Sequence, residues 1–346
     1  MKALVYHGPG EKAWEDVPEP KLQEDTDAVI RVDTTTICGT DLHILKGDTP
    51  EVTNGRILGH EAVGTVEDVG LGVKTLSPGD RVLVSCISAC GSCRFCREGR
   101  YGQCVGGGGW ILGHLIDGTQ AEFVRVPFAD TSTYRIPQGV SDAEIVMVSD
   151  ILPTGYEVGV MNGRVKPGDT VVVVGAGPIG LSAITAAKLY SPSHVVAIDL
   201  ADSRLKAAST FGADLTLNNA HEDAVSYVRD LTDGLGADVA IEAVGVPATF
   251  ELCTELVRPG GRVANIGVHG KPVTLHLESL WTRDVTITTG LVDTFSTPTL
   301  LRLVAAHQIN AGRFATHHFG FDDMLEAYDV YARAADTGAV KVVLAS

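Results

Sequence analysis

Residues Val171–Asp199 read VVVVGAGPIGLSAITAAKLYSPSHVVAID and contain the pattern that decides the fold. Val171–Val174 is a short run of β-branched residues with no polar position, which is typical of a strand buried on both faces of a parallel sheet. Three glycines follow in the spacing GxGxxG, and a helical pattern rich in Ala, Leu and Ile continues to about Tyr190. A second apolar run, Val195–Ile198, ends at Asp199. The stretch therefore predicts a strand, a glycine turn, a helix and a second strand.

Each part of this unit has a mechanical role in a dinucleotide site. The first glycine makes the tight turn, the second lets the backbone approach a pyrophosphate, and the third lets the helix pack on the strand. The helix N-terminus presents unpaired N–H groups and the positive end of its dipole to the phosphates. In a chain with 39 glycines GxGxxG alone is a weak signal, and structural glycine turns are the alternative. The whole combination predicts a doubly wound Rossmann sheet whose cofactor-binding turn consists of Gly175, Gly177, Pro178, Ile179 and Gly180.

Asp199 bears on the choice of dinucleotide. Its carboxylate can accept hydrogen bonds from both ribose hydroxyls of NAD, but it would repel the 2′-phosphate of NADP. Arg204 lies close behind it in the sequence, and a cation there could tolerate that phosphate. We predict NAD as the cofactor, with Asp199 and Arg204 in its binding site.

The composition limits the classes of partner. With 346 residues, the chain is long enough for two domains with sizeable cores. Its net charge of −16 argues against a nucleic-acid or anionic-membrane partner. The N-terminal residues have no signal-peptide core, and no apolar run reaches about 18 residues, so we expect a cytoplasmic protein. Its seven cysteines would stay reduced there, which favours metal binding over disulfides.

Four of these cysteines lie within one short segment in the spacing C-x2-C-x2-C-x7-C. Four thiolates at this spacing can fold around one tetrahedral Zn²⁺ and leave no open position, so this zinc would be structural. Free or redox-active cysteines are one alternative, and an iron–sulfur cluster is another, although the spacing fits neither ferredoxin pattern well. The run Gly106–Gly109 follows, and we expect it to be a flexible linker of this lobe. The predicted ligands are Cys90, Cys93, Cys96 and Cys104.

The remaining sequence predicts a second, β-rich domain made of both chain ends. Residues 1 to about 35 alternate apolar and polar positions with Pro and Gly between them, and short β runs follow at Ala62–Val69, Arg81–Val84 and Ala121–Pro127, as in compact barrel-like β domains. The α/β alternation then runs from about residue 170 to about residue 290. Its last strand, Val285–Thr288, is a candidate edge strand for pairing with a second subunit. The six predicted strands are Val171–Val174, Val195–Ile198, Leu215–Leu217, Val239–Ile241, Val263–Ile266 and Val285–Thr288.

Several motifs together resemble those of one family. They are CGTDLH at Cys38–His43, GHE at Gly59–Glu61, the four-cysteine lobe, GAGPIG and Asp199. With these the chain resembles the zinc-dependent alcohol dehydrogenases of the medium-chain dehydrogenase/reductase family over essentially its whole length. The resemblance implies a GroES-like catalytic domain at residues 1–152 and 292–346, with a structural-zinc lobe at about 88–110. It also implies a Rossmann NAD-binding domain at residues 153–291.

The resemblance also implies a second, catalytic zinc. Cys38 and His60 match two family ligands, and the third ligand position matches Asp150, as in bacterial secondary-alcohol dehydrogenases. Three protein ligands leave one exchangeable position, which is the rule for a catalytic zinc. Glu61 would be either a fourth ligand in the resting state or a neighbour of the ligands. Two zinc ions per subunit are therefore expected.

The implied reaction is the reversible oxidation of an alcohol to a ketone or aldehyde by hydride transfer to NAD, with zinc as a Lewis acid. By resemblance, Thr40 takes the released proton first, the cofactor ribose and His43 relay it to solvent, and Thr154 lies near the nicotinamide. The residues matched to the substrate pocket are Cys86, Ile87 and Trp110.

Three readings of the function stay open. A secondary alcohol is favoured because Ile87 and Trp110 are apolar. A polyol, diol, primary alcohol or aldehyde substrate is the alternative within the family. A zinc- and NAD-binding protein without catalysis is the remote alternative, and the Thr40–His43 pair argues against it. We expect a homo-oligomer, either a tetramer or a dimer, and a small-molecule substrate.

Overall fold

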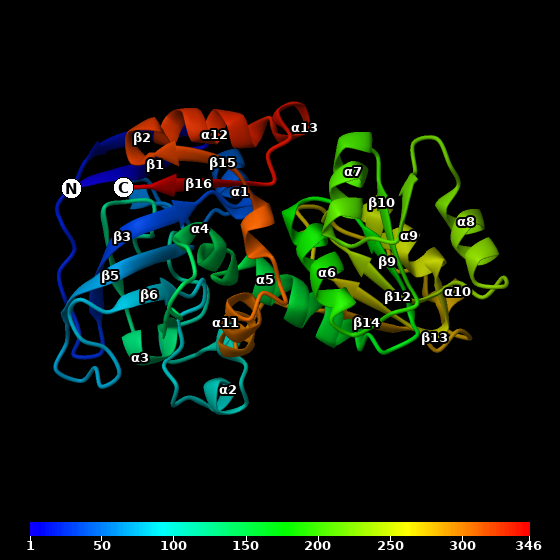
Figure 1. Ribbon diagram of the computed structural model, residues 1–346, viewed down its shortest axis with the longest axis horizontal. Coiled ribbons are helices and arrows are strands. Elements are labelled where there is room, and N and C mark those ends of the chain that lie inside the picture. The colour runs from blue at the N-terminus through cyan, green and yellow to red at the C-terminus, as the bar shows by residue number, and fades with distance from the viewer. The chain divides into compact units, whose positions relative to one another are not determined.

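The computed structural model describes residues 1–346, and the chain divides into two compact units (Figure 1). Unit 1 contains Met1–Asp150 and Val292–Ser346, and unit 2 contains Ile151–Leu291. No helix is both long and apolar enough to cross a bilayer.

Unit 1 is β-rich and contains two sheets. The smaller has the order β2-β1-β4, and the larger has the order β15-β16-β3-β5-β6-β8, with β7 also paired to β3. Its strands are β1 (Lys2–Gly8), β2 (Glu11–Asp16), β3 (Ala28–Thr36), β4 (Arg56–Ile57), β5 (Ala62–Val69), β6 (Arg81–Val84), β7 (Phe123–Val126), β8 (Thr133–Arg135), β15 (Ala315–Gly320) and β16 (Lys341–Ala345). Its helices are α1 (Gly39–Lys46), α2 (Arg94–Arg97), α3 (Ala129–Ser132), α4 (Asp142–Ile145), α11 (Thr297–Ala305), α12 (Met324–Ala332) and α13 (Ala334–Thr337), with single 3₁₀ turns at Tyr101–Gln103, Val146–Val148, Ala311–Phe314 and Phe321–Asp323.

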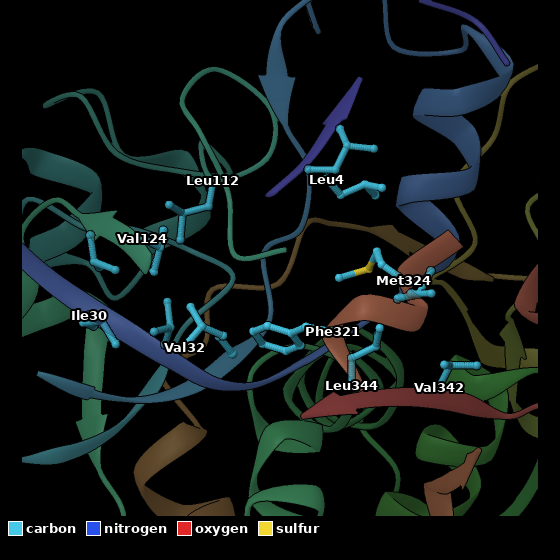
Figure 2. Close-up of a cluster of buried hydrophobic side chains, with 14 of the residues drawn as sticks. Leu4, Ile30, Val32, Leu112, Val124, Phe321, Met324, Val342 and Leu344 are labelled. Carbon is cyan, nitrogen blue, oxygen red and sulfur yellow. The ribbon is translucent and has the colours of Figure 1, made fainter. Parts of the chain in front are cut away.

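The two ends of the chain share one core in this unit. The last strand, β16, pairs antiparallel with β3, so that Val343 lies opposite Thr36. Figure 2 shows Leu4, Ile30 and Val32 in the same buried cluster as Met324 and Leu344. Burying a Leu or Ile side chain contributes about 1.5–3 kcal/mol, so this shared core ties the C-terminal segment to the first domain.

Unit 2 has a parallel six-stranded sheet in the order β11-β10-β9-β12-β13-β14. This is the doubly wound order, and it confirms the predicted Rossmann sheet with its last strand at an edge. The strands are β9 (Thr170–Val174), β10 (His194–Asp199), β11 (Leu215–Asn218), β12 (Ala237–Glu242), β13 (Val257–Asn265) and β14 (Thr286–Thr289). The helices are α5 (Ile151–Thr154), α6 (Pro178–Lys188), α7 (Asp202–Phe211), α8 (Ala224–Leu231), α9 (Pro247–Leu256) and α10 (Leu277–Leu280), with a π-helical segment, η3, at Gly155–Met161.

β13 and β15 differ from what the sequence predicts. β13 begins at Val257, before the predicted start at Val263. Val257 pairs with Ala237, and the register then shifts so that Val239 pairs with Arg262, with Gly260 at a φ of 70° in between. This irregularity hides the first part of the strand from an apolar pattern. β15 was not predicted, since its sequence ATHHFG places two histidines where an apolar alternation would mark a strand. Its pairing comes from β16, whose apolar residues lie beside it.

Candidate functional site

The four-cysteine lobe brings its sulfur atoms together. Cys90, Cys93, Cys96 and Cys104 form one group, in which the sulfurs of Cys90 and Cys96 lie 3.9 Å apart. Tetrahedral zinc with Zn–S bonds of about 2.3 Å separates its sulfur ligands by about 3.8 Å. The lobe therefore fits a zinc ion held by four thiolates.

Hydrogen bonds already favour a thiolate at one of these cysteines. Burial alone would raise the pKa of Cys90, but hydrogen bonds from Ser92 and from the backbone of Cys93 lower it to about 6. Burial and the neighbouring Cys93 raise the pKa of Cys96 to about 12. Four thiolates therefore do not form unaided, and a divalent cation would supply the missing positive charge.

The glycines that follow are part of the lobe, so the expected flexible linker at Gly106–Gly109 is wrong. A Cβ atom on Gly106 would lie 2.5 Å from the Cys90 sulfur, and one on Gly108 would lie 3.1 Å from the Cys104 sulfur. Ser88 and Gly109 exchange two backbone hydrogen bonds of 2.9 and 2.6 Å. These positions require glycine because the backbone passes directly over the sulfurs.

A second group of donor atoms lies inside unit 1. Cys38, His60, Glu61 and Asp150 each offer one atom, and these atoms all lie within 4.8 Å of one another. The antiparallel pairing of β3 with β5 places Thr35 opposite Ala62, which brings the Cys38 segment beside the His60 segment. The residue before Asp150, Ser149, accepts a hydrogen bond from the Cys86 backbone at 3.1 Å.

The distances in this group match those between ligands of one metal ion. The Cys38 sulfur lies 3.6 Å from Asp150 Oδ2, and His60 Nε2 lies 3.4 Å from the same oxygen. A tetrahedral zinc with Zn–S of about 2.3 Å and Zn–N and Zn–O of about 2.0–2.2 Å separates these pairs by about 3.5 and 3.4 Å. The donor set of one thiol, one imidazole and one carboxylate is also a zinc set.

Burial and neighbouring charged groups shift the pKa values of the residues in this group. Burial raises the pKa of the Cys38 thiol, and the Asp150 and Glu61 carboxylates add to the rise although Lys341 opposes it. Burial would lower the pKa of His60, but hydrogen bonds to Asp150 and Cys38 raise it well above its usual value. A bound dication would displace these protons, because metal ligands must be deprotonated.

Glu61 has a cationic partner that the sequence did not reveal. Its Oε2 accepts a hydrogen bond of 2.6 Å from the fully buried Lys341 and another from the Thr36 hydroxyl, while Oε1 is buried and has no partner. Lys341 also donates to the Ile37 carbonyl at 3.0 Å. Burial raises the pKa of Glu61 to about 7, although Lys341 opposes the rise. One oxygen of Glu61 is therefore held by cationic and hydroxyl donors, and the other is uncommitted.

Asp41 is a second residue missed by sequence reasoning. Its Oδ2 accepts a hydrogen bond of 2.8 Å from the backbone N–H of Cys38, and its Oδ1 lies 3.9 Å from His60 Nδ1. The carboxylate thus lies on the side of the imidazole opposite to Nε2, where an outer partner orients a metal-binding histidine. Its position inside the CGTDLH motif was the available signal.

The predicted proton carriers lie on α1. The Thr40 hydroxyl lies 3.7 Å from the Cys38 sulfur, and His43 Nδ1 lies 2.8 Å from Asp48 Oδ2. The His43 side chain is 34% exposed, so this helix leads from the buried donor group to solvent. Asp48, which the sequence did not single out, orients the imidazole.

Trp110, one of the predicted pocket residues, lies beside the donor group. Its ring is edge-on to His60 with a centroid distance of 6.4 Å, and it stacks on His114 at 4.1 Å. Cys86 is held beside the Asp150 segment by its bond to Ser149, and Ile87 is fully buried.

The predicted cofactor turn lies in unit 2. Gly175 has a φ of 99°, and a Cβ atom on Gly180 would collide with the Gly175 carbonyl oxygen, whereas the space beside Gly177 is open. Pro178 is the first residue of α6, followed by Ile179, and Thr154 is the last residue of α5. The turn thus has the tight corner, the close helix–strand contact and the open face that a pyrophosphate needs.

The Asp199 carboxylate fixes this turn to the end of β10. It accepts backbone N–H groups of Ala176 at 2.8 Å, Leu200 at 2.8 Å and Ala201 at 3.0 Å. Arg204 Nη1 lies 3.9 Å from its Oδ2. The predicted acidic residue is therefore at the glycine turn, with the predicted cation beside it.

Comparisons with known proteins agree with these features. A model of the alcohol dehydrogenase GroES-like domain matches residues 24–138, and a zinc-binding dehydrogenase model matches residues 178–306. The chain is similar to the zinc-dependent alcohol dehydrogenase 2 from Streptococcus pneumonia in its apo form, with 48% identity, a TM-score of 0.96 and coverage of 100% of this chain and 98% of that one. An alcohol dehydrogenase from Cupriavidus necator is 38% identical over 363 residues, covering 99% of this chain and 98% of its own. An alcohol dehydrogenase from Escherichia coli complexed with NADH is 26% identical, with a TM-score of 0.90 and coverage of 100% and 99%.

Proposed function

Because the chain belongs to the zinc-dependent alcohol dehydrogenases of the medium-chain dehydrogenase/reductase family, we propose that it interconverts a secondary alcohol and its ketone with NAD(H). The observation that supports this most is the group of Cys38, His60 and Asp150, in which Asp150 Oδ2 lies 3.6 Å from the Cys38 sulfur and 3.4 Å from His60 Nε2. We infer that these three residues hold a catalytic zinc and that the four-cysteine lobe holds a structural one. That makes two zinc ions per subunit.

When bound, zinc acts as a Lewis acid that lowers the pKa of the alcohol, and NAD accepts the hydride. The chain itself must remove the hydroxyl proton. Thr40 is suited to take it, because its hydroxyl both donates and accepts and lies 3.7 Å from the Cys38 sulfur. His43 passes the proton to solvent. The Nδ1–H of His43 donates to the Asp48 carboxylate, so His43 Nε2 is the atom that accepts the incoming proton.

NAD rather than NADP is supported by Asp199. Its carboxylate is negative and held at the glycine turn by three backbone N–H groups, so a 2′-phosphate would meet a fixed anion. Arg204 offsets part of this repulsion, since its guanidinium lies 3.9 Å from the carboxylate. We therefore propose a preference for NAD, with some tolerance of NADP.

A secondary alcohol is supported by the apolar side chains near the donor group. Trp110 presents its ring edge to His60, and Cys86 is held beside the Asp150 segment. A diol is the second candidate, because the imidazole of His114 stacks on Trp110 and adds a polar group to that wall.

The test is a substrate panel that follows NADH formation from 2-propanol, butane-2,3-diol and 1-propanol. We expect the highest kcat/KM with 2-propanol, loss of turnover after chelation, and recovery on adding zinc. A higher kcat/KM with the diol would favour the second candidate. No turnover on any alcohol by zinc-replete protein would favour a binding protein without catalysis.

A homo-oligomer and a cytoplasmic location also remain proposals. β14 lies at the edge of the sheet in unit 2, with one side not paired within the chain, so a second subunit could extend the sheet there. Light scattering coupled to size exclusion would distinguish a tetramer, a dimer and a monomer.

A further inference from the structure

A buried chain of side-chain hydrogen bonds leads from α12 to the residues beside Cys38 and His60. The Tyr328 hydroxyl donates to Gln120 Oε1 at 2.7 Å, and Gln120 Nε2 donates to Asp41 Oδ2 at 3.0 Å. Tyr328, Gln120 and Asp41 are each no more than 1% exposed. The Asp41 carboxylate contacts both proposed ligands: Oδ2 accepts a hydrogen bond of 2.8 Å from the Cys38 backbone N–H, and Oδ1 lies 3.9 Å from His60 Nδ1.

Gln120 lies between the two segments that carry these ligands. On one side its Nε2 also donates to the Thr36 carbonyl at 3.1 Å, just before Cys38. On the other side its backbone N–H donates to the Leu58 carbonyl at 2.9 Å, just before His60. Gly59, with a φ of 93°, packs so closely that a Cβ atom there would lie 2.6 Å from Gln120 Cγ. A shift of Gln120 would therefore move both segments.

Tyr328 determines which way the Gln120 amide points. Nε2 faces two acceptors, so Oε1 must face the tyrosine hydroxyl, which donates to it. Without that hydroxyl, Oε1 would be a buried acceptor with no donor, which is costly, and the amide would have a reason to rotate. Rotation would withdraw the N–H from Asp41 and release the carboxylate.

We propose that Gln120 and Tyr328 are positioning residues for the catalytic zinc, acting through Asp41 on His60 and Cys38. The inference rests on the proposed function, because it assumes that Cys38, His60 and Asp150 bind the metal. An imidazole and a Cys38 backbone that are already oriented need less rearrangement when the metal binds, so metal affinity is higher. Tyr328 lies on α12, and α12 (Figure 1) belongs to the C-terminal segment of unit 1, so this segment would help to position the metal ligands.

The experiment measures zinc affinity in the full-length protein by competition with a chromogenic chelator. Removing an outer partner of a metal ligand typically costs about 10–100-fold in metal affinity, so we expect that loss for Gln120→Leu and about 3–10-fold for the more distant Tyr328→Phe. The double variant should lose no more than Gln120→Leu alone, because Tyr328 acts through Gln120. The zinc of the four-cysteine lobe is the internal control and should be unaffected.

Tyr6→Phe is the matched control, since Tyr6 is buried in the same core cluster as Tyr328 and has no place in the chain of hydrogen bonds. With Co²⁺ in the catalytic site, Tyr328→Phe should change the visible spectrum and Tyr6→Phe should not. Equal zinc affinities for wild type and both single variants, or a double variant whose losses add, would overturn the inference. A wild-type protein that binds metal only in the four-cysteine lobe would instead contradict the proposed function.

Discussion

Asp199 is the residue that carries the cofactor preference. In Asp199→Gly the fixed anion is lost, so we expect the ratio of kcat/KM for NADP to that for NAD to rise about tenfold or more. The KM for NAD should also rise, because the Ala176 N–H of the glycine turn loses its acceptor. Arg204→Ala should move the ratio in the opposite direction. An unchanged ratio in Asp199→Gly would remove the basis for naming NAD.

Lys341 is the residue on which the charge of Glu61 depends. Replacing it by Met leaves a buried carboxylate without its cation, and breaking a buried pair in this way costs about 3–5 kcal/mol. The measurement is the urea midpoint of the zinc-loaded protein. The double variant Glu61→Gln with Lys341→Met should recover part of the loss, because no buried charge then remains unpaired. A midpoint equal to that of wild type for Lys341→Met would show that the pair contributes little.

At the scale of elements, the four-cysteine lobe depends on the backbone passing over its sulfurs. A methyl group on Gly106 would meet the Cys90 sulfur, so Gly106→Ala should lower the free energy of unfolding by about 1–3 kcal/mol and weaken zinc binding in the lobe. Gly270→Ala is the control, since a Cβ atom there meets nothing within 4 Å. Equal denaturation midpoints for the two variants would contradict the packing argument.

The same lobe should show two classes of thiol after zinc is removed. Hydrogen bonds outweigh burial at Cys90 and lower its pKa to about 6, so above that pH it is a thiolate; Cys96, with a pKa of about 12, remains a thiol. Because the thiolate is the nucleophile, iodoacetamide at pH 7.5 should alkylate Cys90 faster. Its rate should fall as the pH drops through about 6. Mass spectrometry of the zinc-free protein measures both rates, and equal labelling at pH 7.5 would contradict this assignment.

For the whole molecule, sequence reasoning succeeded where the interacting residues are close in the chain. GxGxxG, its helix and Asp199 form one continuous unit, and the spacing of Cys90–Cys104 nearly determines how the thiols meet. Gly106–Gly109 was misread because a flexible run and a tightly packed run have the same composition. The set formed by Cys38, His60 and Asp150 came from a family resemblance, since its members lie far apart in the sequence.

The partners of the site residues could not be predicted from local sequence patterns, because they too lie far apart in the sequence. Lys341 reaches Glu61 only because β16 pairs with β3, and Tyr328 reaches Gln120 only because both chain ends share one core. Nothing near Lys341 or Tyr328 in the sequence marks either as a partner of a buried polar group. Such contacts follow from the tertiary packing, which the periodicity of single segments does not determine.

The central claim is that Cys38, His60 and Asp150 hold a catalytic zinc distinct from that of the four-cysteine lobe. The most direct measurement is the zinc content per subunit of active wild-type protein and of Asp150→Asn, alongside their turnover of 2-propanol. The account predicts two zinc ions per subunit in wild type and one in Asp150→Asn. Turnover by Asp150→Asn should fall at least about a hundredfold, because loss of a direct ligand should cost no less than the largest loss seen for an outer partner. Fully active wild-type protein with a single zinc, bound by the four cysteines, would contradict it.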